Sequence, residues 1–433
     1  MEENNQVIRK SISRIESISN HLQVVNVAVT EQQQQQQQVK DQVNVGGSVD
    51  YYGLNDLLND KERLIRKQAK QFAESKILPI ANKYYEKAEF PFELIPLLKQ
   101  LKWAGGNIKG YQCPGMTATE LGMIAMEFAK VSADIATFYS ILQTISMLPI
   151  YYCGSELQKL KYLPKMAAMD SIGCFGLTEP LAGSDASGLL CEARKVDNGW
   201  ILNGEKRWIG NAPFADIIIV WARDTESKKI KGFIVEKGTP GLNVETINNK
   251  ISLRMVQNGH IYFKECLISD DQRLPNANDF NSGPGKCLFL TRIMAAWISL
   301  GVAANAYESC FKYVQSRKQF GTPLSKFQLI QERLVKMLGN LQAMTLMCLR
   351  VSHLFDQQKL SYGQIGLLKA YCTSHGREIV SLARECVGGN GIVTDYGVAR
   401  SFVDMEAIHT FEGSYDINTL IAAREITGHS SFR

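Results

Sequence analysis

The spacing of apolar residues changes twice along this chain, and that change limits the possible folds more than any single motif does. From residue 50 to about residue 169, apolar side chains recur three and four positions apart, as on one face of a helix. Between residues 171 and 280 the period shortens to two, in the runs GWILNG, DIIIVWA, KGFIVEK and HIYFKEC. After Gly283 the helical spacing returns and continues almost to the end. Separate blocks of helix, strand and helix predict an α+β multidomain protein, because doubly wound nucleotide-binding folds alternate strand and helix throughout.

These changes in spacing divide the chain into four expected segments. They are a low-complexity tail over residues 1–49, an N-terminal helical domain over 50–170, a middle antiparallel β domain over 171–282 and a C-terminal helical domain over 283–433. A chain of 433 residues with 45% hydrophobic content can bury cores of this size. The net charge of +5 is spread along the sequence, which does not favour a nucleic-acid-binding protein.

The cysteines indicate buried free thiols, without a disulfide framework or a metal site. All ten are scattered and none forms a C-x-x-C pair, which is typical of a reducing compartment and favours neither a disulfide framework nor a zinc site. We therefore expect no metal. No uninterrupted apolar run approaches the roughly 18 residues of a spanning helix, so we expect no membrane span either.

The first fifty residues contain a possible targeting signal. The homopolymer Gln32–Gln38 and the GGS joint that follows it have little to bury, so we expect the fold to begin near Asp50. The stretch RIESISNHL, Arg14–Leu22, resembles an N-terminal peroxisomal signal and would bind a peroxisomal import receptor. A chance match in a disordered tail and a mitochondrial presequence are the alternatives. Glu2, Glu3 and Glu16 argue against the presequence, because such peptides avoid acids, so we favour the peroxisome over the mitochondrial matrix.

Glycine-rich nucleotide motifs are absent in their usual settings. No G-x-G-x-x-G follows a predicted strand, and no G-x-x-x-x-G-K-S/T occurs, so neither a Rossmann site nor a P-loop is supported. GGNG at Gly388–Gly391 lies between helical patterns. Taken alone, it is equally typical of a turn that ends a helix.

Five short motifs occur in one chain, in a fixed order and at domain-scale spacing. They are CFGLTEPLAGSDAS (174–187), KRWIGN (206–211), SRKQFG (316–321), VGGNG (387–391) and FEGSYDIN (411–418). Together they resemble the acyl-CoA dehydrogenase and acyl-CoA oxidase superfamily over nearly all of residues 50–433. Within that superfamily, ISLRMVQNG (251–259) and MLGNLQAM (337–344) are most similar to the plant-type short-chain peroxisomal acyl-CoA oxidases, which are related to glutaryl-CoA dehydrogenase.

The resemblance implies a fold, a cofactor and an assembly. The fold would be a helical N-terminal domain, a middle β domain and a C-terminal four-helix bundle, with FAD held between domains and across a subunit contact of a homodimer or homotetramer. The implied cofactor-binding residues are Phe175, Leu177, Thr178, Ser184, Trp208, Gly210, Arg317, Gln319, Phe320, Glu385, Gly388, Gly389, Ser414 and Asp416. The guanidinium fork of arginine suits a pyrophosphate, and glycine lets a backbone approach it closely. Without the other motifs, Trp208 would be read as a core residue and Arg317 as a solvated helix end.

The same resemblance assigns Glu412 as the catalytic base. The α-proton of an acyl-CoA leaves only when the thioester carbonyl is polarised, and a carboxylate whose pKa is raised by an apolar site suits its removal. Ser184, Arg292 and Gly413 are the implied substrate-side residues, with Arg292 supporting the loop that carries the base. Some relatives take their base from the residue before that arginine. Thr291 stands there in this chain, so Glu412 is the only base implied.

The expected reaction is FAD-dependent α,β-oxidation of a short- to medium-chain acyl-CoA to a trans-2-enoyl-CoA, with oxygen as acceptor and hydrogen peroxide as product. The alternative is a mitochondrial acyl-CoA dehydrogenase that passes electrons to an electron-transferring flavoprotein. Gly210 stands where dehydrogenases commonly carry threonine, and we hypothesise that the missing side chain opens space beside the flavin. Ala136 stands where glutaryl-CoA dehydrogenase carries an arginine, which argues against glutaryl-CoA. A binding protein without catalysis is a third reading, against which the intact Glu412 weighs.

Overall fold

The fold is seen in a computed structural model that describes residues 48–430. Residues from Val49 onward form one compact unit, and every statement about the fold below refers to it. The signal-like stretch Arg14–Leu22 lies outside the described residues. The peroxisomal localisation therefore stays a prediction.

The N-terminal helices begin where the sequence provides caps. Asn59 accepts a hydrogen bond from the Glu62 backbone, while the Glu62 carboxylate accepts one from the Asn59 backbone, which closes a capping box at the start of the first long helix. Thr117 and Ser155 form the same box with residues three positions later. The helices and short strands of this block are α2 (Asp60–Phe72), α3 (Leu78–Lys87), α4 (Leu94–Leu101), β1 (Lys109–Gly110), β2 (Cys113–Pro114), α5 (Ala118–Val131), α6 (Ala133–Ser140), α7 (Leu148–Cys153) and α8 (Glu156–Ala167).

The middle block is a seven-stranded sheet with its own core. Its strands are β3 (Gly173–Gly176), β4 (Glu192–Val196), β5 (Gly199–Gly210), β6 (Ile217–Asp224), β7 (Ile230–Glu236), β8 (Leu242–Thr246) and β9 (Asn258–Ser269). Hydrogen-bonded neighbours follow the order β3-β6-β4-β5-β9-β8, and β7 pairs with β6. The sheet is mostly antiparallel, as expected, but β6 pairs in parallel with both β3 and β4. A cluster that includes Trp200, Phe233 and Ile261 fills its inner face.

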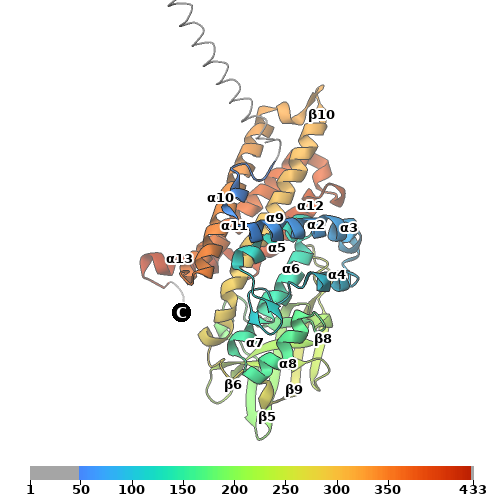
Figure 1. The fold of residues 1–433 in the computed structure, drawn as a ribbon. Coiled ribbons are helices and arrows are strands. Elements are labelled where there is room, and N and C mark those ends of the chain that lie inside the picture. The colour runs from blue at the N-terminus through green and yellow to red at the C-terminus, as the bar shows by residue number, and fades with distance from the viewer. Residues whose placement is uncertain (1–47, 431–433) are drawn as a thin grey trace, which may run out of the picture. The chain divides into compact units, whose positions relative to one another are not determined.

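The C-terminal block is a bundle of long helices. Its elements are α9 (Lys286–Ser316), β10 (Lys318–Gln319), β11 (Thr322–Pro323), α10 (Gln328–Asp356), α11 (Tyr362–Val387), α12 (Val398–Thr410) and α13 (Tyr415–Thr427). Figure 1 shows α9 running from the sheet along the bundle to the β10–β11 hairpin at the far tip. Among the described residues, the helical stretch Asn281–Ser316 is the one long and apolar enough to cross a membrane, but 89% of its apolar window is buried inside the protein. It has the character of a core helix.

The two helical blocks share one core because two glycines let α5 and α9 approach closely. A Cβ added at Gly122 would lie 2.3 Å from the Trp297 ring, and one added at Gly301 would lie 2.4 Å from the Met126 carbonyl oxygen. Both Trp297 and the neighbouring side chains of α9 are fully buried. Since α9 also carries residues of the candidate site, this contact fixes the site relative to the N-terminal helices.

A loop of the β block is tied to both helical blocks by buried carboxylates. The backbone N–H of Met255 donates to Asp134 on α6 at 2.7 Å, and that of Leu253 donates to Asp404 on α12 at 2.7 Å. Burial raises the pKa of both carboxyl groups. The loop ends at Asn258, whose amide donates to the Trp208 carbonyl on β5 at 3.0 Å. The strand that carries Trp208 is thereby held against the helices.

Candidate active site

Glu412 lies in a tight turn between α12 and α13 with an unusual backbone. Its φ is +56°, and that of Gly413 is +85°, so two successive residues are left-handed. Glycine adopts this conformation freely, but for glutamate it costs about 1–2 kcal/mol. The surrounding structure must therefore hold the turn.

Three side chains from three helices donate to the carbonyl groups around this turn. Asn418 on α13 donates to the carbonyls of residues 412, 413 and 414, at 3.3, 2.8 and 3.0 Å. Arg292 on α9 donates to the Glu412 carbonyl at 3.3 Å. Lys369 on α11 donates to the carbonyls of His409 and Gly413, at 2.9 and 2.7 Å. The structure thus places the predicted substrate-side residues Arg292 and Gly413 beside Glu412.

The Glu412 side chain is partly buried, and within the described residues its carboxyl group accepts one hydrogen bond. Thr291 Oγ1 donates to Glu412 Oε2 at 2.6 Å. Burial raises the pKa of Glu412, and the Thr291 hydrogen bond, followed by the charges of Arg292 and Lys369, partly opposes that rise. A carboxylate with a raised pKa is the base that proton abstraction near neutral pH requires.

The Thr291 hydrogen bond leads to a prediction about pH. Because this bond favours the ionised form of Glu412, Thr291→Val should raise the Glu412 pKa further. Activity that needs the carboxylate is lost as pH falls through that pKa, so the acid limb of kcat/KM should move to higher pH. We expect a shift of about half a pH unit to one unit. It is measured from kcat/KM at a series of pH values, with an acyl-CoA that saturates the enzyme. Thr291→Ser, which keeps the hydroxyl, should retain the wild-type limb, and a limb unmoved in Thr291→Val would contradict the assignment.

Most of the predicted cofactor residues fall into two groups, and the first lies on or beside the sheet. Phe175 on β3 is buried against Trp221, while Leu177 and Thr178 follow that strand and contribute their carbonyls to Lys206 and to the Arg207 backbone. Trp208 has a left-handed φ of +67° at an irregular point in the β5–β9 pairing, and its side chain is 54% exposed. An exposed tryptophan held in this way is not the core residue that composition alone would suggest. Ser184 also lies exposed in the loop after β3.

The second group lies at the opposite end of the unit, at the tip of the bundle (Figure 1). Arg317 follows α9, and Gln319 and Phe320 sit in the adjoining hairpin, where Phe320 is 95% exposed. Glu385, Gly388 and Gly389 end α11, and Asn390 beside them donates to the Tyr313 hydroxyl of α9 at 3.0 Å. The structure therefore brings this group together. At 1.5 Å per helical residue, α9 carries it about 39 Å beyond Thr291.

Three predicted residues have surroundings that differ from the expectation. Ser414 caps α13, since its Oγ accepts from the Ile417 backbone at 3.3 Å, and Asp416 is exposed in the first turn of that helix. At Gly210, a Cβ would lie 2.5 Å from Ile141 Cδ1. The room that we expected glycine to open is thus occupied by an isoleucine from the π-helical turn Ile141–Ile145, because that turn packs towards β5.

Several residues of the site were not predicted from the sequence. Thr291 was noted as the absence of a second base, and its role as a hydrogen-bond donor to Glu412 was missed. Lys369 lies among ordinary helical residues, and nothing local marks it. Asn418 is the last residue of the motif FEGSYDIN, but no role was predicted for it. A buried ion pair between Lys206 and Glu179, at 2.7 Å, was also missed, although both residues lie within the motifs quoted above.

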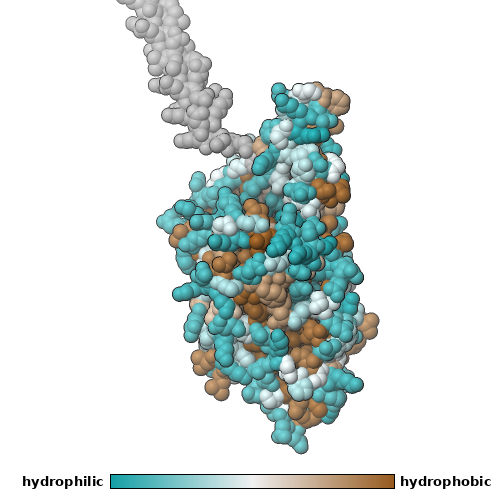
Figure 2. All heavy atoms as spheres, turned by 90° about the vertical axis from the view of Figure 1, so that its right-hand side faces the viewer, coloured by the Kyte–Doolittle hydropathy of each residue, from teal (hydrophilic) through white to brown (hydrophobic). Residues whose placement is uncertain are grey.

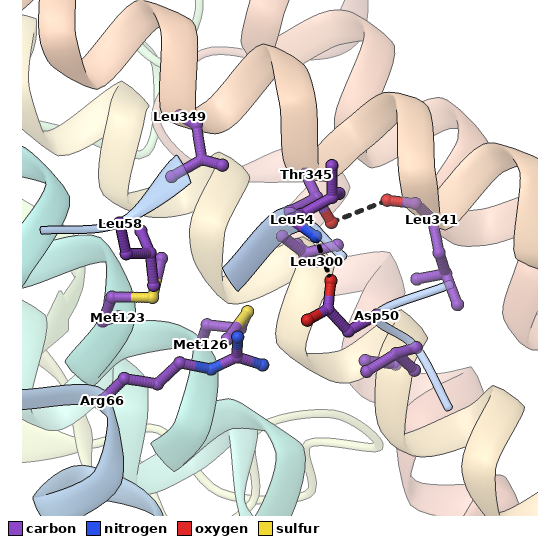
Figure 3. A pocket seen from close by; sticks show the side chains of 12 residues that line it. Asp50, Leu54, Leu58, Arg66, Met123, Met126, Leu300, Leu341, Thr345 and Leu349 are labelled. Atoms are coloured by element: carbon purple, nitrogen blue, oxygen red, sulfur yellow. Dashed lines mark hydrogen bonds between the residues drawn. The ribbon is translucent and has the colours of Figure 1, made fainter. Parts of the chain in front are cut away.

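A small cavity lies elsewhere, between the segment that precedes α2 and helices α5, α9 and α10 (Figure 3). It is lined by mostly apolar side chains, including Leu54, Met126, Leu300 and Leu349, and has a volume of about 20 Å³. That volume holds about one water molecule. It is therefore not a substrate site. In the part of the chain that the structure describes, no group of three or more His, Cys, Asp or Glu side chains is placed to hold a metal ion.

Comparison with protein families accounts for the chain in three consecutive pieces. The N-terminal, middle and C-terminal domains of acyl-CoA dehydrogenase match residues 59–170, 174–266 and 285–427. The chain belongs to the acyl-CoA dehydrogenase family. The superfamily resemblance and the expected fold class are thereby confirmed.

Two curated relatives of this acyl-CoA dehydrogenase family member are named as mitochondrial dehydrogenases. The mitochondrial 2-methylacyl-CoA dehydrogenase of Solanum tuberosum is 30% identical, over 86% of this chain and 92% of its own length. The mitochondrial isovaleryl-CoA dehydrogenase of Arabidopsis thaliana is 28% identical, over 86% of this chain and 92% of its own.

Solved structures give the same result for the fold. Glutaryl-CoA dehydrogenase from Mycobacterium smegmatis, in complex with FADH2, superimposes with a TM-score of 0.86 at 33% identity, covering 89% of this chain and 99% of that one. Butyryl-CoA dehydrogenase from Megasphaera elsdenii gives a TM-score of 0.81 at 29% identity, covering 86% and 99%.

Proposed function

We propose that this protein is an FAD-dependent acyl-CoA dehydrogenase that converts short- to medium-chain acyl-CoA to trans-2-enoyl-CoA, with Glu412 as the base. The observation that carries the proposal is the partly buried Glu412 carboxyl group with a raised pKa, held in a left-handed turn, in a member of this family. A general base must reach the proton that it removes, and the turn fixes where the carboxylate points.

The residues around the Glu412 turn have different roles in the proposed reaction. Glu412 Oε takes the α-proton, and Thr291 orients that carboxylate through its hydroxyl. The backbone N–H of Glu412 has no acceptor among the described residues, so it is available to polarise the thioester carbonyl, as an oxyanion hole does. Arg292 and Asn418 keep the turn in place through the Glu412 carbonyl. When bound, FAD would supply the acceptor for the hydride that leaves the β-carbon.

The residues present fit FAD. The exposed indole of Trp208 offers a flat face and follows Arg207, whose backbone N–H donates to the Thr178 carbonyl. The guanidinium of Arg317 offers the donor fork that a pyrophosphate takes. A Cβ added at Gly388 or Gly389 would meet nothing within 4 Å, so the backbone there is open to close approach. These features support the predicted cofactor set on the sheet and at the bundle tip.

The separation of the two cofactor groups supports an oligomer. The roughly 39 Å along α9 between Thr291 and Arg317 exceeds the reach of one dinucleotide, so the tip of one chain would complete the site of another. Phe320, nearly fully exposed at the tip, is an apolar side chain without cover in the described chain. Figure 2 also shows apolar surface gathered along the middle of one face, flanked by hydrophilic side chains. A patch of this kind marks an interaction site, and we propose a homodimer or homotetramer.

For the electron acceptor, the relatives support the alternative better than our first expectation. The curated relatives and solved structures above are named as dehydrogenases, whereas the sequence analysis favoured an oxidase. Ile141 also fills room beside Gly210, which removes part of the structural argument for oxygen access. We therefore propose an electron-transferring flavoprotein as the acceptor. The compartment rests on Arg14–Leu22 and stays a prediction, with the mitochondrial matrix as the alternative.

The substrate and the acceptor are tested together. We expect butyryl-CoA and hexanoyl-CoA to be oxidised rapidly with an electron-transferring flavoprotein and to yield little hydrogen peroxide in air without it. Glutaryl-CoA should be poor, because Ala136 lies buried on α6 where a cation would be needed for the distal carboxylate. Rapid peroxide formation without the flavoprotein would restore the oxidase reading, and bound FAD that no acyl-CoA reduces would restore the non-catalytic one.

A further inference from the structure

Lys369 is a buried lysine behind the Glu412 turn that the reaction, as described, does not use. It lies in the first third of α11, and it is 0% exposed. Lysine is almost never fully buried unless it is paired, because its ammonium group loses its hydration. Its two hydrogen-bond acceptors here are backbone carbonyls, those of His409 and Gly413, and no carboxylate within the described residues forms an ion pair with it.

These two carbonyls lie on either side of Glu412. The His409 carbonyl belongs to the last turn of α12, and the Gly413 carbonyl follows the base directly. One ammonium group therefore ties the end of the helix to the left-handed turn. The hydroxyl of Thr373, one helical turn further along α11, donates to the Lys369 carbonyl at 2.9 Å and contacts His409 Nδ1 at 3.2 Å, which joins the same two helices again.

The charges that face Lys369 make it part of the electrostatics of the base. They are Glu412 in the turn, Arg292 on α9 and the titratable His409 on α12, while α13 contributes the uncharged Asn418, which shares the Gly413 carbonyl. Burial lowers the pKa of Lys369 to about 7, Glu412 opposes that fall and Arg292 adds to it. In turn, the positive charge of Lys369 lowers the pKa of Glu412.

Resting on the function proposed above, we propose that Lys369 is a positioning residue for the Glu412 base. It holds the turn through two backbone carbonyls, and its charge favours the ionised carboxylate. The residue does not touch the reacting atoms. It acts through Glu412, so its removal should change how Glu412 titrates and not only how fast the enzyme works.

The test compares two substitutions with a matched control on the same helix. Lys369→Met removes both the donors and the charge, whereas Lys369→Gln removes the charge and keeps an amide donor. Ile379→Ala empties a buried position about 15 Å further along α11 and serves as the control for lost packing. For each protein, kcat and KM are measured across pH, together with FAD content.

Both lysine variants should move the acid limb of kcat/KM to higher pH by about half a unit or more, because a cause that lowers the Glu412 pKa is gone. Lys369→Met should also lower kcat by about 10- to 100-fold, since the turn loses its tether, with KM changed much less. Ile379→Ala should keep the wild-type limb. A limb unmoved in both lysine variants, with kcat lowered equally at every pH, overturns the inference and leaves Lys369 a purely structural residue.

A second measurement does not depend on turnover. The Tm values of wild type, Lys369→Met, Glu412→Gln and the double variant form a double-mutant cycle, recorded at about pH 6.5, below the Lys369 pKa. We expect Tm shifts that are not additive, because each charge stabilises the other in the folded protein. Additive shifts would overturn the inference even if no acyl-CoA were oxidised. Non-additive Tm shifts in a protein that oxidises no acyl-CoA would reject the proposed function but leave the link between Lys369 and Glu412 intact.

Discussion

Glu412→Gln should abolish acyl-CoA oxidation while leaving the protein folded and its FAD bound. The substitution keeps the size and the hydrogen-bonding capacity of the side chain, so the contact with Thr291 and the turn itself can persist. It removes the group that takes the α-proton. Loss of a positioned general base costs about 100- to 10,000-fold, so kcat/KM should fall by at least that range. Stopped-flow reduction of the flavin by butyryl-CoA measures the step directly.

The matched control for this change is Glu412→Asp, which keeps the charge but shortens the arm by one methylene group. We expect it to retain partial activity, because the carboxylate is present but sits further from the α-carbon. Flavin absorbance and Tm establish that both variants are folded and loaded. Rapid flavin reduction in Glu412→Gln would remove this residue from its role and direct attention to another acceptor of the proton.

Gly413→Ala should lower kcat by about 100-fold with little loss of protein, because the turn that carries the base would shift. A Cβ at this position would lie 2.9 Å from Asn418 Nδ2, the atom that donates to the carbonyls of residues 412 to 414, and φ is +85°. Both the contact and the backbone conformation oppose a side chain there. A misplacement of the base by about 1 Å is enough for a loss of this size. Steady-state kinetics with FAD content as the loading control measure it.

Gly428→Ala separates backbone strain from the geometry of the site. Gly428 ends α13 with φ of +75°, and a Cβ there would meet nothing within 4 Å. The two substitutions therefore share the strain of a left-handed alanine, about 1–2 kcal/mol, but only one touches the turn. We expect Gly428→Ala to lower Tm slightly and to keep kcat. Equal kinetic losses in both variants would mean that the loss follows stability and not the position of Glu412.

Much of the fold was predictable because periodicity is a local property of the chain. The four runs read as β-rich became β5, β6, β7 and β9, and the helical spacing after Gly283 became the bundle. The strands β4 and β8 were not predicted, since EARKV and LNVET bury few side chains and so show little alternation. The parallel pairing of β6 with β3 and β4 was not predictable either, because pairing depends on which distant strands meet.

Part of the candidate site was likewise predictable from the sequence, and part was not. Read together with the four other motifs, FEGSYDIN marked Glu412 with a glycine beside it, and the other motifs marked the residues now seen on the sheet and at the bundle tip. Only the tertiary structure decided what surrounds that base. Thr291, Lys369 and Asn418 come from α9, α11 and α13, and their hydrogen bonds around the base were not predicted from the sequence. Hydrogen bonds and pKa shifts arise from burial and from short distances between segments far apart in the chain, and only the packing of these helices around the turn creates both.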